Sequence, residues 1–517
     1  MGLKLKMCGL LTFVVLASQF ANAQNPLPPD ADMSKCTLTQ AQFASWFANG
    51  VVTQNGLVKP ADSLGFKSDS LCNFYQWSTQ MFLWLNSPVS GTGGRVFDSP
   101  VFYDVEAVQG KGFVLVPNTV GRIRTLGVRS AQVGSSGKQL LVSTAGVVSE
   151  VETGQAGGNG TLLSQNGSLV YYSIHVNDVF AYMRTGMQTT PPQINLQGFP
   201  TTAADLKQIT DFATQKLHKQ VLDPTALAME LKISWVDAAS VPNPQDYITM
   251  IANVPTYDFS VPPDSKTGMW PTGPIKQKLL AMVGMHVVGS AAGHPEMIWA
   301  TFEHVNNAPN GPYSYRNKAG SVVNVPSNPQ GKWLFSDGTS NAPNTLNLTT
   351  VNATGNSPSG IKPQNSTSPK PIASNTIRTF PWGGAQGADG VENNTEIISL
   401  NNAVISMLGN DIRKNYVHIG SVWTRGMIPP TGTTQPKPVP TPPLPPTPIP
   451  MNAQSVGSVL LSNATMETYH QSIPNPPAYT PATGMNCFSC HNTGNTTASS
   501  ANLSPLSHIW STLQPLE

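Results

Sequence analysis

The sequence predicts an α+β fold: a β-rich body with helices near its ends, a proline-rich strut and a short C-terminal segment. Three observations lead to this prediction. Apolar and polar side chains alternate in the middle of the chain, helix-like spacing is found mainly towards the ends of the body, and 11 prolines fall within the 22 positions 429–450. Hydrophobic residues make up 39% of the chain, which is enough for a sizeable core.

The first 23 residues are typical of a secretory signal peptide. Lys4 and Lys6 provide a short positive start, and the apolar stretch 10–16 is too short to span a bilayer. Ala21-Asn22-Ala23 has the small-x-small form of a cleavage site, which would leave Gln24 as the first residue. We therefore expect export, to the periplasm rather than to the medium.

The charge of the mature chain argues against anionic partners. Of 29 basic residues, two lie in the signal, so 27 remain against 27 acidic residues. Lysine and arginine form no runs, which argues against a nucleic-acid-binding protein. No further apolar stretch reaches 18 residues, so we expect no membrane span in the mature chain.

Two helices are expected early in the body, at 37–49 and 68–86. Ser68 or Asp69 can cap the second one and Pro88 ends it. Its body is apolar on most sides, so this helix should be buried. Further helices are expected at 202–219 and 394–409, where apolar side chains recur at helical spacing.

The strands are expected mostly between these helices. The clearest is 227–235, where Leu231, Ile233 and Trp235 alternate with polar residues such as Glu230 and Lys232. The other expected strands are 101–108, 112–116, 139–144, 170–176, 246–252 and 332–336.

The composition divides the chain into a body at 24–427, which could hold two subdomains, a linker at 428–451 and a C-terminal segment at 452–517. The prolines of the linker favour a semi-rigid polyproline II strut. Within the body, 340–375 is rich in Asn, Ser, Thr and Pro and is expected to be a long surface excursion.

Four cysteines remain after cleavage, because Cys8 is lost with the signal. Cys487 and Cys490 belong to one tight motif, which leaves Cys36 and Cys72 as a natural disulfide in an oxidising compartment. The alternative is a pair of buried thiols.

The motif Cys487-Phe488-Ser489-Cys490-His491 has the C-x-x-C-H form of c-type haem attachment. Two thiols three positions apart can form thioethers with the two vinyl groups of one haem, and His491 can then bind the iron as proximal ligand. A thioredoxin-like redox site or half of a zinc site fits less well. The motif lies in a coil-forming stretch, and the other mature cysteines are more than 400 residues away.

The sixth ligand of such a haem is left open by the sequence. Only 26 residues follow His491, none of them Met, so we expect the body to cover the haem or the haem to be unusually exposed. Met466 is the first distal candidate, His508 the second and His286 the third. The other residues considered are His470, Met485, His294 and His304.

The body segment 283–304 combines apolar residues with several titratable ones. On strand spacing, His286 shares a face with Leu280, Met282 and Val288, so it is either a satisfied core histidine or a ligand. Glu303 shares a face with Trp299, and His304 lies opposite. Glu303 and His304 form either a buried hydrogen-bonded arrangement or, together with His286, the acid–base groups of an active site.

Several pieces of the chain resemble a family of poorly characterised exported bacterial proteins identified only as cytochrome c family. They are 77–83, 229–235, 283–287, 299–309, 415–423 and 463–471, the last of these just ahead of the haem motif. The resemblance implies one covalent haem and a periplasmic location, and it implies no established reaction. The proline strut and the 340–375 excursion depart from the usual pattern of the family.

Three functions remain open. The first is single-electron transfer by a periplasmic mono-haem protein with a redox partner protein. The second is a peroxidase- or oxidase-like haem enzyme with a small-molecule substrate pocket in the body. The third is a ligand-binding module with a haem tail. A body of about 400 residues is larger than electron transfer through a single haem requires.

Overall fold

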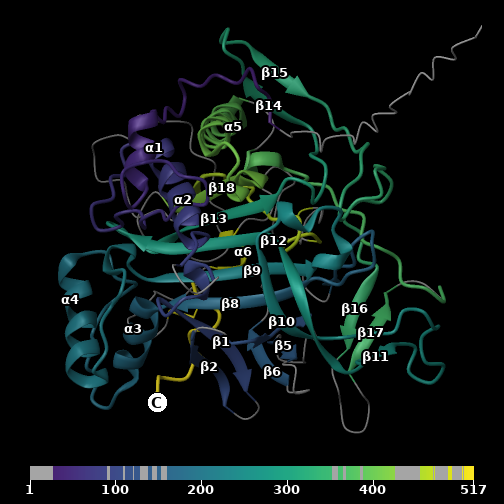
Figure 1. The fold of residues 1–517 in the computed structure, drawn as a ribbon, viewed down its shortest axis with the longest axis horizontal. Coiled ribbons are helices and arrows are strands. Elements are labelled where there is room, and N and C mark those ends of the chain that lie inside the picture. Colours follow the sequence, from purple (N-terminus) through teal and green to yellow (C-terminus); the bar gives the residue numbers. More distant parts are fainter. Residues whose placement is uncertain are drawn as a thin grey trace, which may run out of the picture.

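A large, mainly antiparallel sheet forms the centre of the molecule (Figure 1). The structure is a computed structural model, and it describes residues 27–89, 94–108, 111–119, 122–128, 138–142, 148–152, 160–351, 359–364, 368–384, 388–424, 455–469, 471, 487–491, 503–504 and 506–517. The central sheet has 11 strands, eight of which follow the order β19-β18-β13-β12-β9-β8-β1-β2. Strands β10, β3 and β4 join it at the side.

The strands of the central sheet are β1 (Phe102–Val108), β2 (Gly112–Pro117), β3 (Arg124–Thr125), β4 (Gly127–Val128), β8 (Tyr171–Asn177), β9 (Met229–Asp237), β10 (Thr249–Pro255), β12 (Ile275–Ala291), β13 (His294–His304), β18 (Tyr416–Thr424) and β19 (Ser455–Gly457). The long β12–β13 hairpin provides the middle of the sheet, and β19 brings the C-terminal segment to its edge. The body and the C-terminal segment therefore share one sheet.

Smaller sheets surround the central one. One of them has four strands: β7 (Gly160–Thr161), β11 (Trp270–Pro271), β16 (Leu348–Val351) and β17 (Gly360–Pro363). The other two have two strands each: β5 (Lys138–Val142) pairs with β6 (Val148–Glu152), and β14 (Tyr313–Arg316) pairs with β15 (Val322–Val325). The excursion at 340–375 thus contributes two strands, β16 and β17.

Helix α2 (Leu71–Leu85) lies against one face of the sheet, which we call the helix face. Ser70 caps it by accepting a hydrogen bond from the Asn73 N–H, so the cap is neither Ser68 nor Asp69 as the sequence predicted. Phe82 stacks on Phe302 of β13, and Phe74 stacks on Trp423 of β18. The prediction of a buried helix is confirmed, because the helix buries apolar side chains on most of its sides.

The remaining α-helices are α1 (Gln40–Trp46), α3 (Asp178–Gln188), α4 (Ala203–Phe212), α5 (Ala388–Leu408) and the single turn α6 (Cys487–Cys490). Three of the predicted helices correspond to α1, α4 and α5, but α3 was not expected. It follows β8 directly and is capped by the Asn177 side chain, which accepts from the Phe180 N–H. Among the described residues, no helix is long and apolar enough to cross a bilayer.

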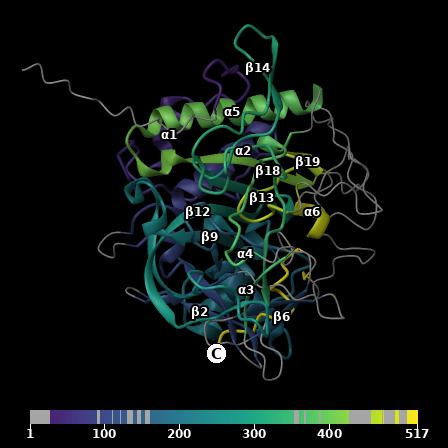
Figure 2. The same ribbon diagram turned by 90° about the vertical axis from the view of Figure 1, so that its right-hand side faces the viewer.

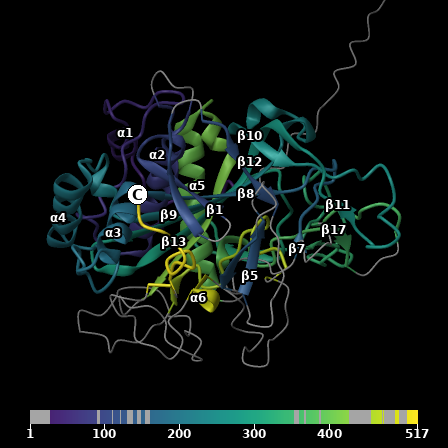
Figure 3. The ribbon, with the colours of Figure 1, turned by 90° about the horizontal axis from the view of Figure 1, so that it is seen from below.

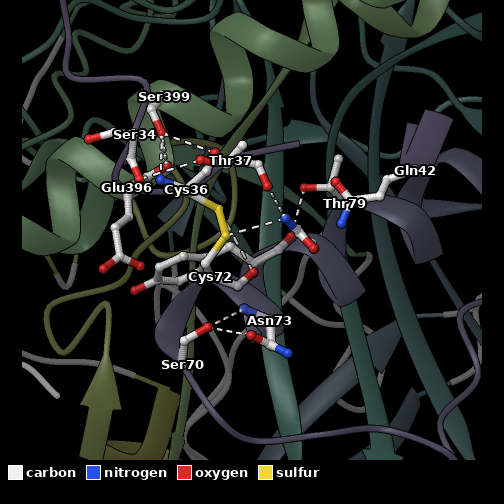
Figure 4. Close-up of a disulfide and its surroundings, with 12 residues drawn as sticks. Ser34, Cys36, Thr37, Gln42, Ser70, Cys72, Asn73, Thr79, Glu396 and Ser399 are labelled. Carbon is white, nitrogen blue, oxygen red and sulfur yellow. Dashed lines mark hydrogen bonds between the residues drawn. A yellow bond between two sulfur atoms is a disulfide. The ribbon is translucent and has the colours of Figure 1, made fainter. Parts of the chain in front are cut away.

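The disulfide between Cys36 and Cys72 is confirmed (Figure 4). It joins the segment before α1 to the first turn of α2. The Cys36 N–H also donates to Ser399 Oγ of α5 at 3.2 Å. The disulfide and this hydrogen bond together join three separate parts of the chain above the helix face.

The alternation predicted for 227–235 is confirmed in β9. Leu231, Ile233 and Trp235 are fully buried in the core, while Glu230 and Lys232 are half-buried on the opposite face. The strands predicted at 101–108, 112–116, 139–144, 170–176 and 246–252 correspond to β1, β2, β5, β8 and β10 to within about three residues, whereas the described strands other than these and β9 had no counterpart among the predicted ones. The prediction of a strand at 332–336 is wrong, because this stretch is a loop tied by backbone hydrogen bonds to Asn306 and Asn307.

A β-bulge in β12 changes the face that His286 occupies. The register with β9 shifts between Met282 and Gly284, so Met282 lies opposite Trp235 whereas His286 lies opposite Lys232. His286 therefore shares its face with Val288, as predicted, but not with Leu280 and Met282. The extra residue in the bulge reverses the alternation that the sequence suggested.

The C-terminal segment covers the second face of the sheet, which we call the tail face (Figures 2 and 3). Tyr172 of β8 donates to the Thr465 carbonyl at 2.7 Å, and Ser234 of β9 bonds the Thr465 hydroxyl at 2.8 Å. Further along, the Phe113 N–H of β2 donates to the Thr512 carbonyl at 3.1 Å. The linker predicted at 428–451 lies outside the described residues.

Candidate functional site

The C-x-x-C-H motif lies on the tail face, at the single-turn helix α6 (Figure 3). The His491 N–H donates to the Cys487 carbonyl at 2.8 Å, which continues the turn through the motif. Phe488 is buried, and its ring contacts Trp299 of β13 at 6.0 Å between centroids. Residues of the body therefore hold the motif against the sheet.

His491 is held in one tautomer by the C-terminal segment. Its Nδ1 lies 2.7 Å from the Leu506 carbonyl oxygen, which can only accept, so Nδ1 carries the proton. The other ring nitrogen, Nε2, then keeps its lone pair while the ring is neutral. Burial, and next the nearby His508, hold the pKa of His491 well below its usual range.

Two rings contact His491. The His508 ring stacks on it at 4.1 Å between centroids with planes 15° apart, and the Trp299 ring lies at 4.3 Å. Trp299 is itself fixed, because its indole N–H donates to the Glu296 carbonyl at 2.9 Å. The imidazole is thus positioned by a backbone carbonyl and by two aromatic neighbours.

These residues fit a covalently bound haem c. Cys487 and Cys490 stand at the two ends of one helical turn, which is the spacing that two thioether bonds to one porphyrin require. A neutral histidine whose Nδ1–H is bonded to a carbonyl is the usual form of an iron-binding imidazole. When bound, the haem would supply one-electron chemistry at its iron. Within the described residues, no cluster of three or more His, Cys, Asp or Glu could hold a bare metal ion.

The distal candidates occupy different surroundings. Two histidines that bind one iron from opposite sides point their nitrogens at each other, whereas the His508 ring lies face to face with His491. Met466 is buried in a turn that Glu303 anchors by accepting from the Ala464 N–H at 2.7 Å. Distal ligation by Met466 or His508 stays a prediction. His470 and Met485 lie outside the described residues.

Both ring nitrogens of His286 are occupied. Its Nε2 lies 2.9 Å from Glu467 Oε1, and its Nδ1 lies 2.9 Å from the Thr301 hydroxyl. Burial acts to raise the pKa of Glu467, but the charge and hydrogen bond of His286 outweigh it and hold that pKa at about 2. In this arrangement His286 offers no lone pair to a metal, so it binds the tail to the sheet.

Glu230 and Lys232 of β9 lie on the tail face of the sheet, as His286 does. Burial raises the pKa of Glu230 to about 7, although the nearby Ser507 acts to lower it. Both Lys232 and His286 act to lower the pKa of His491, so their charges are close enough to reach it. We call Glu230, Lys232, His286 and Glu467 the charged row.

Glu303 and His304 are buried and structural in this fold. Glu303 accepts from Arg378 Nε at 3.0 Å, and neither side chain is more than 3% exposed. Burial lowers the pKa of His304 to about 3, and its ring stacks on Tyr247. His294 is likewise buried and bonded to Glu296 at 2.9 Å. These contacts agree with the hydrogen-bonded arrangement considered from the sequence.

Sequence reasoning found the motif but missed its neighbours. The half-buried polar positions of β9, Glu230 and Lys232, were visible as alternation, yet nothing in the sequence showed what they would face. Trp299 was noted only for sharing a face with Glu303, and the Leu506 carbonyl carried no signal, because the roles of both depend on how the tail returns to the sheet.

Comparisons of the chain with protein-family models, with curated proteins and with solved structures find no match.

Proposed function

We propose that this protein is an exported mono-haem c-type cytochrome that transfers single electrons to or from a redox partner protein. Cys487 and Cys490 would carry the haem, and His491 would bind its iron as the proximal ligand. The observation that carries the proposal is the bond from His491 Nδ1 to the Leu506 carbonyl, which leaves Nε2 for the metal. The resemblance to cytochrome c family proteins and the expected periplasmic location support it.

Mass spectrometry of protein produced with the haem-attachment machinery tests the proposal. We expect one haem mass that survives acid–acetone extraction, and its loss in the Cys487→Ser/Cys490→Ser variant. The matched control is Cys36→Ser/Cys72→Ser, which removes the disulfide but should keep the haem. Retention of covalent haem in the first variant would refute the assignment.

Voltammetry then tests electron transfer. A reversible one-electron wave and a low-spin spectrum, unchanged by added cyanide, are expected of an electron carrier. Met ligation adds a weak far-red band to the ferric spectrum, which two histidines do not give. A low-spin spectrum unaffected by Met466→Ala would exclude that residue as the distal ligand.

The charged row favours a second candidate, a peroxidase- or oxidase-like haem enzyme. A carboxyl group with a pKa of about 7, as Glu230 has, can donate or accept a proton near neutral pH. Ser507, which acts to lower the pKa of Glu230, is the neighbour of His508, whose ring stacks on His491. A high-spin spectrum with rapid cyanide or peroxide binding, and a peroxidase rate that falls in Glu230→Gln, would favour the enzyme.

A further inference from the structure

A pocket with a volume of about 250 Å³ opens at the far end of the central sheet from Glu230, outside the candidate haem site. Asp237 at the end of β9 and Lys278 of β12 contribute to it, as do Tyr171 of β8 and the loop residues Tyr257 and Phe259. The proposed electron transfer makes no use of these residues.

Three aromatic residues line part of the pocket, and packing holds two of them, Tyr257 and Phe259, in place. The rings of Tyr257 and Phe259 are parallel to within 12°, and Phe259 packs edge-on against Trp270. The Trp270 indole N–H donates to the Val261 carbonyl at 2.8 Å, which closes the loop on itself. Aromatic rings on a loop that is already held in place can stack against the C–H face of a flat ligand, and the loop then need not be ordered on binding.

The polar groups of the pocket are paired with each other. Asp237 binds Lys278 through Oδ2, and its Oδ1 accepts from the Ala239 N–H at 3.0 Å. The Asp237 N–H donates to Ser168 Oγ at 2.9 Å, which ties β9 to the turn before β8. Asn166 at the rim donates to the Ser240 carbonyl at 2.7 Å and has an amide oxygen as acceptor.

We propose that this pocket binds a single pyranose ring of a neutral carbohydrate. A charged ligand would have to compete with the Asp237–Lys278 ion pair. Hydroxyl groups can instead donate to the remaining lone pairs of the carboxylate and accept from the ammonium while that pair stays intact. The combination of ring faces with a fixed array of donors and acceptors therefore suits a polyol ring.

The size of the pocket limits the ligand. Its volume of about 250 Å³ is below the roughly 300–1,000 Å³ of drug-sized sites. One sugar ring fits this volume, and a longer glycan would extend out of the pocket. The body would then recognise a carbohydrate while the tail carries the haem.

Calorimetric titration with a panel of methyl hexosides tests the proposal on the full-length exported protein. We expect at least one hexoside to bind with a Kd near 1 mM, the affinity of a small weak ligand. Phe259→Ala and Tyr257→Ala should each weaken binding about tenfold, because each removes a stacking face. Phe66→Ala is the matched control, since Phe66 is half-buried against Phe74 and His294 at the turn end of the β12–β13 hairpin, far along β12 from Lys278, and this variant should bind normally.

Choline and phenylalanine serve as cationic and zwitterionic probes. Binding of either one in place of every hexoside would overturn the ligand class, and binding of none of the probes would overturn the site. Circular dichroism verifies that the alanine variants fold, and Tyr257→Phe provides a milder change that keeps the ring. The Cys487→Ser/Cys490→Ser protein should bind the same hexosides, so failure of the haem proposal leaves this test intact.

Discussion

Glu303 offers the sharpest test of whether the tail face is held by structural ion pairs or built for catalysis. The carboxylate is fully buried and accepts from Arg378 Nε at 3.0 Å and from the Ala464 N–H at 2.7 Å. Glu303→Ala removes both acceptors and leaves the guanidinium of Arg378 buried without its counter-charge. We expect a loss of about 3–5 kcal/mol in the free energy of unfolding, as for other buried pairs that lose one partner.

The remaining contacts of Arg378 limit the expected loss in the free energy of unfolding. Arg378 still donates through Nη1 to the Ala308 carbonyl and to Asn310, which favours the lower end of that range. The double variant Glu303→Leu/Arg378→Met removes both charges together, so it should cost less than Glu303→Ala alone.

Urea denaturation followed by tryptophan fluorescence measures both variants. The explanation would be refuted if Glu303→Ala lost less than about 1 kcal/mol, or if the cost of the double variant equalled the summed costs of Glu303→Leu and Arg378→Met, measured separately in the same way. Loss of a haem-dependent activity in Glu303→Gln with unchanged stability would instead assign Glu303 to the chemistry.

Three further outcomes concern stability. Reducing the bridge between Cys36 and Cys72, which are 36 positions apart, should cost about 4 kcal/mol on the chain-entropy model, measured as the urea midpoint with and without dithiothreitol. Because His286 holds the pKa of Glu467 at about 2, below the unfolded value of 4.5, the contribution of Glu467 to stability should be lost as the pH drops below about 4.5, and Glu467→Gln should make the acid slope shallower in acid titrations. The pKa of Glu230 is raised to about 7, so stability should fall as the pH rises from 4.5 to about 7, and unfolding at pH 5 and pH 8 should show Glu230→Gln to be less pH-dependent.

The opposite signs of the last two effects make them separable. A carboxyl whose pKa is lowered in the fold stabilises it above the unfolded pKa, whereas one whose pKa is raised destabilises it there. Asp104, Asp178 and Glu396 have pKa values shifted in the same two directions, so the changes caused by Glu467→Gln and Glu230→Gln, rather than the whole pH profile, report on how the tail lies on the sheet. A profile that neither substitution changes would contradict the placement of the charged row.

Several features of the structure could be predicted from local patterns in the sequence. The alternation in β9 arises because successive side chains on a strand point to opposite faces. The buried helix α2 could be predicted from an apolar run with few polar positions. The Cys36–Cys72 disulfide could be predicted because the other two cysteines of the mature chain belong to the C-x-x-C-H motif. The C-x-x-C-H motif carries its expected chemistry within five consecutive residues, which is why no tertiary information was needed to find it.

Other features depended on contacts between residues far apart in the chain. One extra residue in the β12 bulge reversed the face of His286, and such a register shift leaves no mark on composition or period. The Leu506 carbonyl fixes the tautomer of His491, and Glu467 pairs with His286 across 181 positions, only because the C-terminal segment folds back over the sheet. The sequence by itself supplied the motif on which the proposal of a haem rests. The tertiary structure decided their neighbours, because hydrogen bonds and charges act over a few ångströms of space, whatever the separation along the chain.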